Sequence, residues 1–246
     1  MNKERIVIGC CGLPVALEKY AGMLNAVETQ QTFYQLIPEK TAQTWREKAD
    51  KVKSGFEFTV KAHQFITHNP NGSTYLRAGI KIPEEKKQNY GFFKQTEEVF
   101  SAWEHTVKIA TILRAKAILI QSPPQFSEKP DNVTNLKSFF ERAKDSNFLL
   151  FWEPRGKWKD ETVKEICAQY GVYQCVDPTR RRPVTEKFFY FRLHGGARYR
   201  GTYNQHELAD LASMLMALDG ELAFVFFNNE YMLADAQKFV KIIEEI

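Results

Sequence analysis

The sequence has no long apolar run and few cysteines, and both absences narrow the classes of protein to consider. No apolar stretch approaches the roughly 18 residues that a membrane-spanning helix needs, so we expect no membrane insertion. No basic segment followed by an apolar run of roughly 7–15 residues stands near the start, so no secretory signal is predicted. The four cysteines include no CxxC pair, and adjacent Cys10 and Cys11 do not suit a zinc site. We therefore expect a reduced, cytoplasmic protein, with a Cys167–Cys175 disulfide left open.

Two common nucleotide-binding and hydrolase signatures are also missing. The turn after the first apolar run reads GCCGLPV, which is not the GxGxxG of a Rossmann dinucleotide site. GxSxG does not occur either, so Ser122, which precedes Pro123 and Pro124, is not a nucleophile elbow. The net charge of +4 is too small to indicate a nucleic-acid binder unless the basic residues cluster.

What the sequence does contain is a regular alternation of apolar strand patterns and helical patterns. Strands are predicted over residues 5–12, 26–34, 56–63, 115–123, 148–155, 172–178, 188–195 and 221–229. Residues 64–87 lack a period and indicate a linker, and a long helical pattern from about 86 to 114 breaks near Gly91. Such alternation predicts right-handed βαβ units in a parallel sheet.

Eight units in 246 residues favour one domain, residues 1–246, folded as an α/β protein with a (β/α)8 TIM-like barrel. We expect irregularity in the first unit, whose helix is short, and in the sixth, whose strand pattern is weakest.

Polar side chains follow the apolar part of nearly every predicted strand. They are Glu28, Thr32 and Tyr34; Lys61 and His63; Gln121; Glu153 and Arg155; Asp177; Arg192 and His194; and Asn228 and Asn229. Barrel enzymes carry their active sites at this end of the strands. An isolated charge beside an apolar run is costly to bury unless it is paired. We therefore expect these groups to converge in one polar cluster.

The alternation of side chains along each strand indicates which groups face inward. Residues two apart share a face, so Lys61, Glu153 and Arg192 are each on the face that is expected to point into the barrel mouth. A purely structural ion-pair network that closes the top of the barrel is the alternative interpretation.

The loop after the seventh strand carries Gly195 and Gly196, followed by Arg198 and Arg200. Backbone N–H groups and arginines at this place in a barrel are typical of a phosphate site. A glycine turn with two solvated arginines is the alternative. His194, just before the glycines, is a candidate general base, a metal ligand or a core histidine.

Two further interpretations involve nucleic acid and metal. The run Arg180–Arg182, together with Arg198, Arg200 and nearby tyrosines, is consistent with a groove for single-stranded nucleic acid, although such a run is more often a solvated loop. A divalent metal site could be assembled from Glu28, Glu153, Asp177 and His194. These four lack any fixed ligand spacing, so the sequence requires no metal and the cofactor stays unknown.

Six motifs occur in an order that resembles a known family. They are VETQQTFY, FTVKAHQFITH, IQSPPQF, WEPRGKW, RLHGGARYRGTY and FFNN, which span residues 27–229 and are similar to motifs of the DUF72, or YecE-like, family of uncharacterised barrels. The resemblance implies a TIM-like barrel with a pocket at its C-terminal face. It places in that pocket, among others, Glu28, Thr32, Tyr34, Lys61, Gln121, Glu153, Arg192, His194, Gly195, Tyr199, Tyr203, Asn228 and Asn229. Departures are Gln30 for a usual asparagine, GCCGL for GTSGW, and Ser122 for a common leucine.

The leading hypothesis is an enzyme that acts on a small polar or anionic substrate at the barrel mouth. Lys61, Arg192 and the glycine–arginine loop would hold anionic oxygens, while Glu28, Lys61, Glu153 and His194 would supply acid–base chemistry. Substrate binding is expected from Thr32, Tyr34, Gln121, Arg155, Asp177, Arg192, Gly195, Tyr199, Tyr203, Asn228 and Asn229. The alternatives are an endonuclease IV-like or nucleic-acid-binding protein that uses residues 180–200, and a non-catalytic scaffold. The reaction and the oligomeric state do not follow from the sequence.

Overall fold

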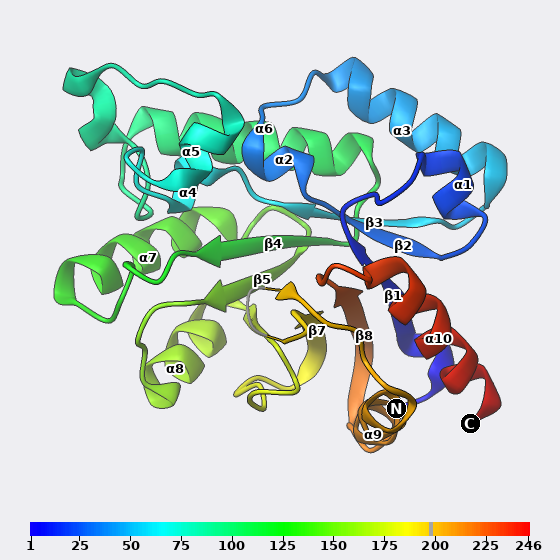
Figure 1. The fold of residues 1–246 in the computed structure, drawn as a ribbon. Helices are drawn as coiled ribbons and strands as arrows, with labels where there is room; N and C mark the ends of the chain where they lie inside the picture. The colour runs from blue at the N-terminus through cyan, green and yellow to red at the C-terminus, as the bar shows by residue number, and fades with distance from the viewer. Residues whose placement is uncertain (197–198) are drawn as a thin grey trace.

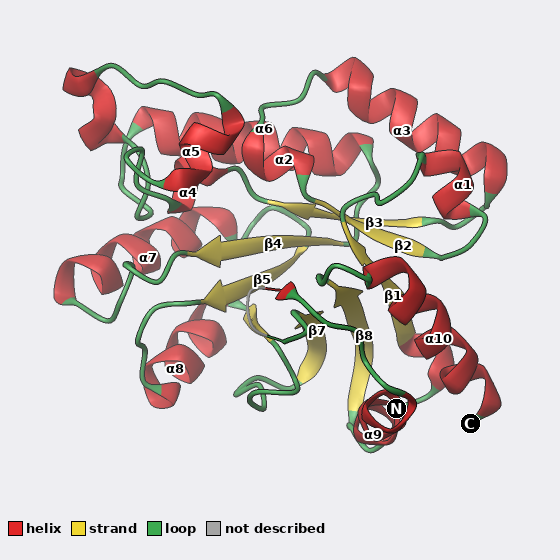
Figure 2. Ribbon diagram, viewed as in Figure 1, coloured by secondary structure: helices red, strands yellow, loops and turns green. Residues whose placement is uncertain are grey.

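Eight parallel strands close into a barrel in the computed structural model, which describes residues 1–196 and 199–246 (Figures 1 and 2). The strands are β1 Ile6–Cys11, β2 Ala26–Thr29, β3 Glu57–Lys61, β4 Ala117–Ser122, β5 Leu149–Pro154, β6 Val172–Val176, β7 Lys187–Leu193 and β8 Gly220–Phe227. Each strand pairs with the next one in the sequence, and β8 pairs with β1. The predicted (β/α)8 barrel is confirmed.

The helices lie outside the barrel, as the red elements around the yellow strands in Figure 2 show. They are α1 Leu17–Ala21, α2 Gln31–Tyr34, α3 Glu39–Val52, α4 Gln64–Thr67, α5 Ser73–Ala78, α6 Glu97–Ile112, α7 Pro130–Ala143, α8 Asp160–Tyr170, α9 Gln205–Met216 and α10 Met232–Glu245, with 3-10 turns at Lys3–Arg5 and Glu84–Asn89. The two chain ends lie beside each other near α10, where the Lys3 ammonium donates to the carbonyl of Glu244 (Figure 1). None of the described helices is long and apolar enough to cross a membrane.

Two predicted elements have other boundaries. The strand expected over residues 26–34 ends at Thr29, because the Thr32 hydroxyl bonds the carbonyls of Thr29 (2.7 Å) and Lys61 (2.8 Å) and turns the chain into α2. The helical pattern of residues 86–114 is divided by Gly91, Phe92 and Phe93, whose φ angles of 74°, 53° and 56° are incompatible with a right-handed helix.

The irregular units are those that the sequence predicted. Helix α1 has only five residues, and residues 177–186, all of them described, connect β6 to β7 without a helix. All four cysteines are buried and unpaired in the described structure, so Cys167 and Cys175 form no disulfide there.

Alternating side chains divide the core into an outer layer under the helices and an inner cluster inside the barrel. The inner cluster contains Phe151, Tyr190, Phe224 and Phe226, whose rings lie 4.9–6.1 Å from their neighbours in the cluster. Gly9 leaves room first for β2 and then for this packing, since a Cβ there would lie 2.0 Å from the carbonyl oxygen of Ala26 and 2.9 Å from the Phe226 ring. The polar strand ends begin directly above these aromatic rings.

Candidate active site

A buried arginine lies at the centre of the barrel mouth, between two buried carboxylates. Arg192, on β7, is 1% exposed, and its Nε and Nη2 both donate to Glu28 on β2 over 3.0 Å. Its Nη1 donates to Oε2 of Glu153 on β5 over 2.7 Å. This two-sided, partly bidentate pairing compensates the charges that the strands bring out of water.

Both carboxylates are occupied by further donors. Glu28 also accepts from the Tyr190 hydroxyl (2.8 Å) and from the Gln30 amide. Glu153 also accepts from Gln121 Nε2 (2.6 Å) and Arg155 Nε (3.0 Å). Burial by itself raises the pKa of Glu153, but the charges of Arg192 and Arg155 outweigh it and hold that pKa far below its usual range. Glu153 is therefore ionised at neutral pH.

Lys61, at the end of β3, is buried beside this cluster without an ion pair among the described residues. Its Nζ donates to the Gln121 amide oxygen over 3.0 Å and lies 4.0 Å from the centre of the Phe33 ring. Burial, and then the charge of Arg192, lower the pKa of Lys61 to about 7. Lys61 therefore exchanges a proton near neutral pH.

These groups lie under a cavity of about 500 Å³ at the carboxyl ends of the strands. Its described lining contains four cationic side chains, Lys61, Arg77, Arg155 and Arg192, and no carboxylate. His68 also lines it, and burial, with Lys61 and Arg155 nearby, lowers its pKa to about 3, so this imidazole is neutral. The cavity is therefore suited to an anion.

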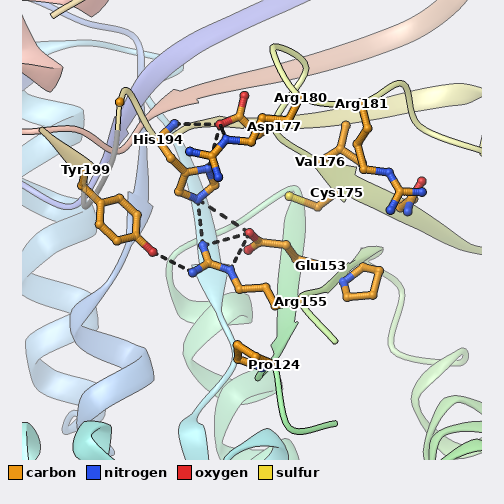
Figure 3. A pocket seen from close by; sticks show the side chains of 13 residues that line it. Pro124, Glu153, Arg155, Cys175, Val176, Asp177, Arg180, Arg181, His194 and Tyr199 are labelled. Carbon is orange, nitrogen blue, oxygen red and sulfur yellow. Dashed lines mark hydrogen bonds and ion pairs between the residues drawn. The ribbon is translucent and has the colours of Figure 1, made fainter. Parts of the chain in front are cut away.

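A second cavity of about 390 Å³ opens on the other side of Arg155, above β5, β6 and β7 (Figure 3). Arg155 Nη2 lies 2.7 Å from His194 Nε2, and Nδ1 of the same ring lies 3.1 Å from Asp177. Since arginine only donates, Nε2 must accept and Nδ1 must carry the proton that bonds Asp177. Arg155 Nη1 also donates to the Tyr199 hydroxyl over 2.6 Å. The Arg155–Tyr199 pair thus lies between the two cavities, and both side chains line each of them.

The loop after β7 is held mainly by its own contacts. The Gly195 amide donates to the Tyr203 hydroxyl (2.7 Å), and the Gly196 amide donates to the carbonyl of Arg200 (2.8 Å). The Asn229 amide donates to Gly201 and to buried Asp235, each over 2.8 Å. Both glycine amides that the sequence suggested for phosphate are therefore already bonded, and Arg198 lies outside the described residues.

The sequence-predicted residues fall into two groups in the structure. One hydrogen-bonded network contains Glu28, Lys61, Gln121, Glu153, Arg155, Asp177, Arg192, His194 and Tyr199, and the 500 Å³ cavity also touches Tyr34, Asn228 and Asn229. Thr32, Gly195 and Tyr203 instead hold backbone in place.

Sequence reasoning missed a contribution from the segment after β3. Thr74, Arg77 and His68 line the main cavity, and Arg77 donates to the Tyr34 hydroxyl over 3.1 Å. All three belong to residues 64–87, which the sequence pattern predicts to be a linker because they lack an apolar period. The signal that could have found these residues is the length of that segment, because long loops after barrel strands are commonly functional.

The residues suggested for a divalent metal do not fit one. Every oxygen of Glu28 and Glu153 accepts from a nitrogen or hydroxyl donor, and Asp177 bonds His194 and Thr179. Within residues 1–196 and 199–246, no group of three or more His, Cys, Asp or Glu side chains is placed to hold a metal ion.

Comparison with known proteins agrees with this architecture. A solved DUF72 family protein from Enterococcus faecalis is 21% identical, with a TM-score of 0.73 and 98% of each chain covered. A xylose isomerase domain containing protein from Salmonella typhimurium is 14% identical, with a TM-score of 0.61 and 100% and 98% of the two chains covered. Endonuclease IV from Thermus thermophilus is 12% identical, with a TM-score of 0.56 and 98% and 100% covered. At these identities the likeness shows a shared barrel fold.

No curated protein matches the chain. A family model described as "Protein of unknown function DUF72" matches residues 12–245, which is nearly the whole length. The family resemblance carried by the six sequence motifs is therefore confirmed, and the chain belongs to the DUF72 family.

Proposed function

We propose that this protein is an enzyme that binds a small anionic substrate in the 500 Å³ cavity and moves a proton through Lys61. The observation that carries the proposal is the described lining, in which four cationic side chains meet and no carboxylate faces the space. Guanidinium groups bind phosphate and carboxylate oxygens through paired N–H donors, and they do so most strongly where water is excluded.

Lys61 is the acid–base group of this proposal. A general acid or base works best when its pKa lies near the working pH. The pKa of Lys61, about 7, meets that condition, whereas the strongly lowered pKa of Glu153 makes this carboxylate a weak base. Gln121, bonded to both Lys61 and Glu153, would orient the ammonium.

The remaining predicted residues act through Arg192 and Arg155. Glu28 and Glu153 would fix the orientation of Arg192, since together they accept its three N–H contacts. His194, bonded to Asp177, would hold Arg155 at the rim of the cavity. Asn228 lines the same cavity and would orient the substrate.

Neither the shared fold nor the basic run carries the nucleic-acid alternative. Endonuclease IV shares the fold at 12% identity, which carries no chemistry to this chain. Arg180 and Arg181 are paired with Asp177 and Asp160, so carboxylates already compensate two arginines of the basic run. We favour the small-anion proposal because its cationic side chains share the lining of one cavity, whereas a non-catalytic scaffold would bind no ligand there.

A thermal-shift screen tests the proposal directly. Phosphorylated and carboxylated metabolites are compared with uncharged counterparts, and each anion that binds should raise Tm, because a ligand at 100 times its Kd stabilises by roughly 2.7 kcal/mol. The shift should shrink in Lys61→Met and Arg77→Gln. It should persist in Arg5→Gln, which alters an exposed arginine beside Gly220 at the opposite end of the barrel.

Two results would contradict the proposal. One is stabilisation by uncharged and anionic compounds alike, and the other is an anion effect that Lys61→Met and Arg77→Gln leave intact. Single-stranded DNA serves as a further probe in the same screen. Binding that weakens steeply with salt and requires Arg180 and Arg181 would instead favour the nucleic-acid alternative.

A further inference from the structure

Lys61 differs from Arg155 and Arg192, its cationic neighbours in the cavity, because it has no direct ion pair with a carboxylate among the described residues. Arg192 engages both Glu28 and Glu153, and Arg155 engages Glu153 from the other side. The hydrogen-bond partner of Lys61 among the described residues is the neutral Gln121 amide oxygen, at 3.0 Å. A buried ammonium without a counter-ion loses its proton readily, whereas a guanidinium does not.

The neutral form of Lys61 is a nucleophile that faces the anion-binding cavity. The side chain lines the cavity although the residue is only 4% exposed, and the Phe33 ring covers it at 4.0 Å from the Nζ. Arg77, Arg155 and Arg192 line the same space and stay charged while the amine is neutral. A desolvated amine beside other cationic groups is an arrangement that activates lysine for covalent catalysis.

We propose that Lys61 forms an imine with a carbonyl carbon of the substrate, so that the substrate is a small aldehyde or ketone that also carries a phosphate or carboxylate group. This inference rests on the proposed function, because it needs the cavity to bind an anion. The lone pair of Nζ attacks the carbonyl carbon, and the carbonyl oxygen leaves as water together with the two N–H protons. The product is a C=N bond, which withdraws electrons from the neighbouring carbon.

The cavity supplies both parts of such a substrate with partners. The arginines would hold the anionic end, and the Lys61 Nζ would reach the carbonyl carbon. The pKa of about 7 supports this role, since about half of the amine is then neutral at neutral pH, against roughly one part in a few thousand for an exposed lysine. Among the described lining groups, Lys61 is the one that combines a nucleophilic nitrogen with a pKa lowered to near neutrality.

Reductive trapping tests the inference on the full-length protein. The probes are dihydroxyacetone phosphate, pyruvate and uncharged dihydroxyacetone, each with sodium borohydride, which donates hydride to the imine carbon and leaves a stable secondary amine. Peptide mass mapping should find, on Lys61, a mass gain equal to the probe less one oxygen atom. We expect at least about tenfold more adduct on Lys61 with the anionic probes than with dihydroxyacetone, because charge-assisted bonds hold only the former.

The pH dependence and a charge-preserving variant make the assignment specific. Trapping on Lys61 should level off above pH 7, whereas trapping on an ordinary exposed lysine should continue to rise toward roughly pH 10. Lys61→Arg keeps a cation but removes the nucleophile, so the selective adduct should disappear in it. Adducts on exposed lysines show in every sample that the trapping chemistry works.

The outcomes separate this inference from the proposed function. Anions that raise Tm while no Lys61 adduct forms would overturn the imine and leave the anion-binding enzyme standing. Equal trapping of charged and uncharged probes on Lys61 would overturn the anionic carbonyl as the substrate class. If anions do not raise Tm and no adduct is trapped on Lys61, both proposals are overturned together.

Discussion

The inside of the barrel has two layers of opposite character, which lie two residues apart along β5 and β7. The lower layer, which we call the aromatic floor, consists of Phe151, Tyr190, Phe224 and Phe226. The upper layer, the ionic mouth, consists of Glu28, Lys61, Glu153 and Arg192. One step of side-chain alternation changes Phe151 to Glu153 on β5 and Tyr190 to Arg192 on β7.

The comparison shows how the floor determines the chemistry of the mouth. The tightly packed rings exclude water from below, so the charges above them are nearly fully buried and must compensate one another. Glu28 and Glu153 do so with Arg192 and Arg155, which leaves the nearby Lys61 without an ion pair among the described residues. Stability in the floor comes from apolar packing, whereas stability in the mouth depends on complete charge pairing.

Removing the central cation should break the mouth and give the largest effect. Arg192→Met leaves Glu28, 0% exposed, without a counter-ion and Glu153, 6% exposed, with Arg155 alone, which we expect to cost about 3–5 kcal/mol of unfolding free energy. Urea denaturation measures the change. Arg181→Met is the matched control, because its pair with Asp160 is on the surface and should be worth at most about 1 kcal/mol.

A second substitution separates charge from shape in this experiment. Adding Glu28→Gln to Arg192→Met removes the charge that has lost its counter-ion and should recover part of the loss. If Arg192→Met costs no more than Arg181→Met, the buried charges are not dependent on pairing and the contrast between floor and mouth fails.

The strand order and the inward direction of the mouth residues could be predicted from the sequence because both follow from local rules. Alternation along β3, β5 and β7 is enough to aim Lys61, Glu153 and Arg192 at one place. It does not predict which of these side chains pair. That Arg192 engages both carboxylates depends on side-chain reach across the barrel, which connects residues 164 positions apart in the case of Glu28.

The parts of the site that the sequence did not predict are determined by loops. Arg77 and His68 enter the cavity from a segment with no apolar period, and only the three-dimensional course of α4 and α5 brings them there. The Gly195 amide was expected to face a ligand, but it donates to the hydroxyl of Tyr203, eight positions later in the same loop. Such contacts depend on tertiary packing rather than on local sequence.

Tyr190 spans the boundary between floor and mouth, and removing its hydroxyl sharpens the comparison. Its ring packs in the floor, while its hydroxyl donates to Glu28 over 2.8 Å and lies 2.8 Å from the Thr59 hydroxyl. Tyr190→Phe keeps the packing and removes a donor to a buried charge, so we expect a loss of about 2 kcal/mol in urea denaturation.

The matched control is the same substitution at a neutral site. The Tyr20 hydroxyl is also buried, but it bonds the Ala26 carbonyl and the Cys10 amide, so Tyr20→Phe should cost only about 1 kcal/mol. Equal losses for the two variants would show that the charge of Glu28 does not strengthen the bond from Tyr190.

The smallest expected effect is the change in unfolding free energy that Lys61 contributes per pH unit. The sign of this change follows from the lowered pKa of Lys61. Between pH 7 and pH 10 the unfolded chain holds a proton on Lys61 that the folded chain has released, so the unfolded state binds more protons and stability rises with pH. The contribution of Lys61 should therefore increase by about 1.4 kcal/mol from pH 8 to pH 9. Below pH 7 both states are protonated and the contribution is constant.

Lys61→Met removes this dependence, so the difference in unfolding free energy between wild type and variant should change with that slope. A difference that stays flat across this range would mean that Lys61 keeps its proton in the folded barrel, and the amine would then be unavailable both as a base at neutral pH and as the nucleophile of an imine.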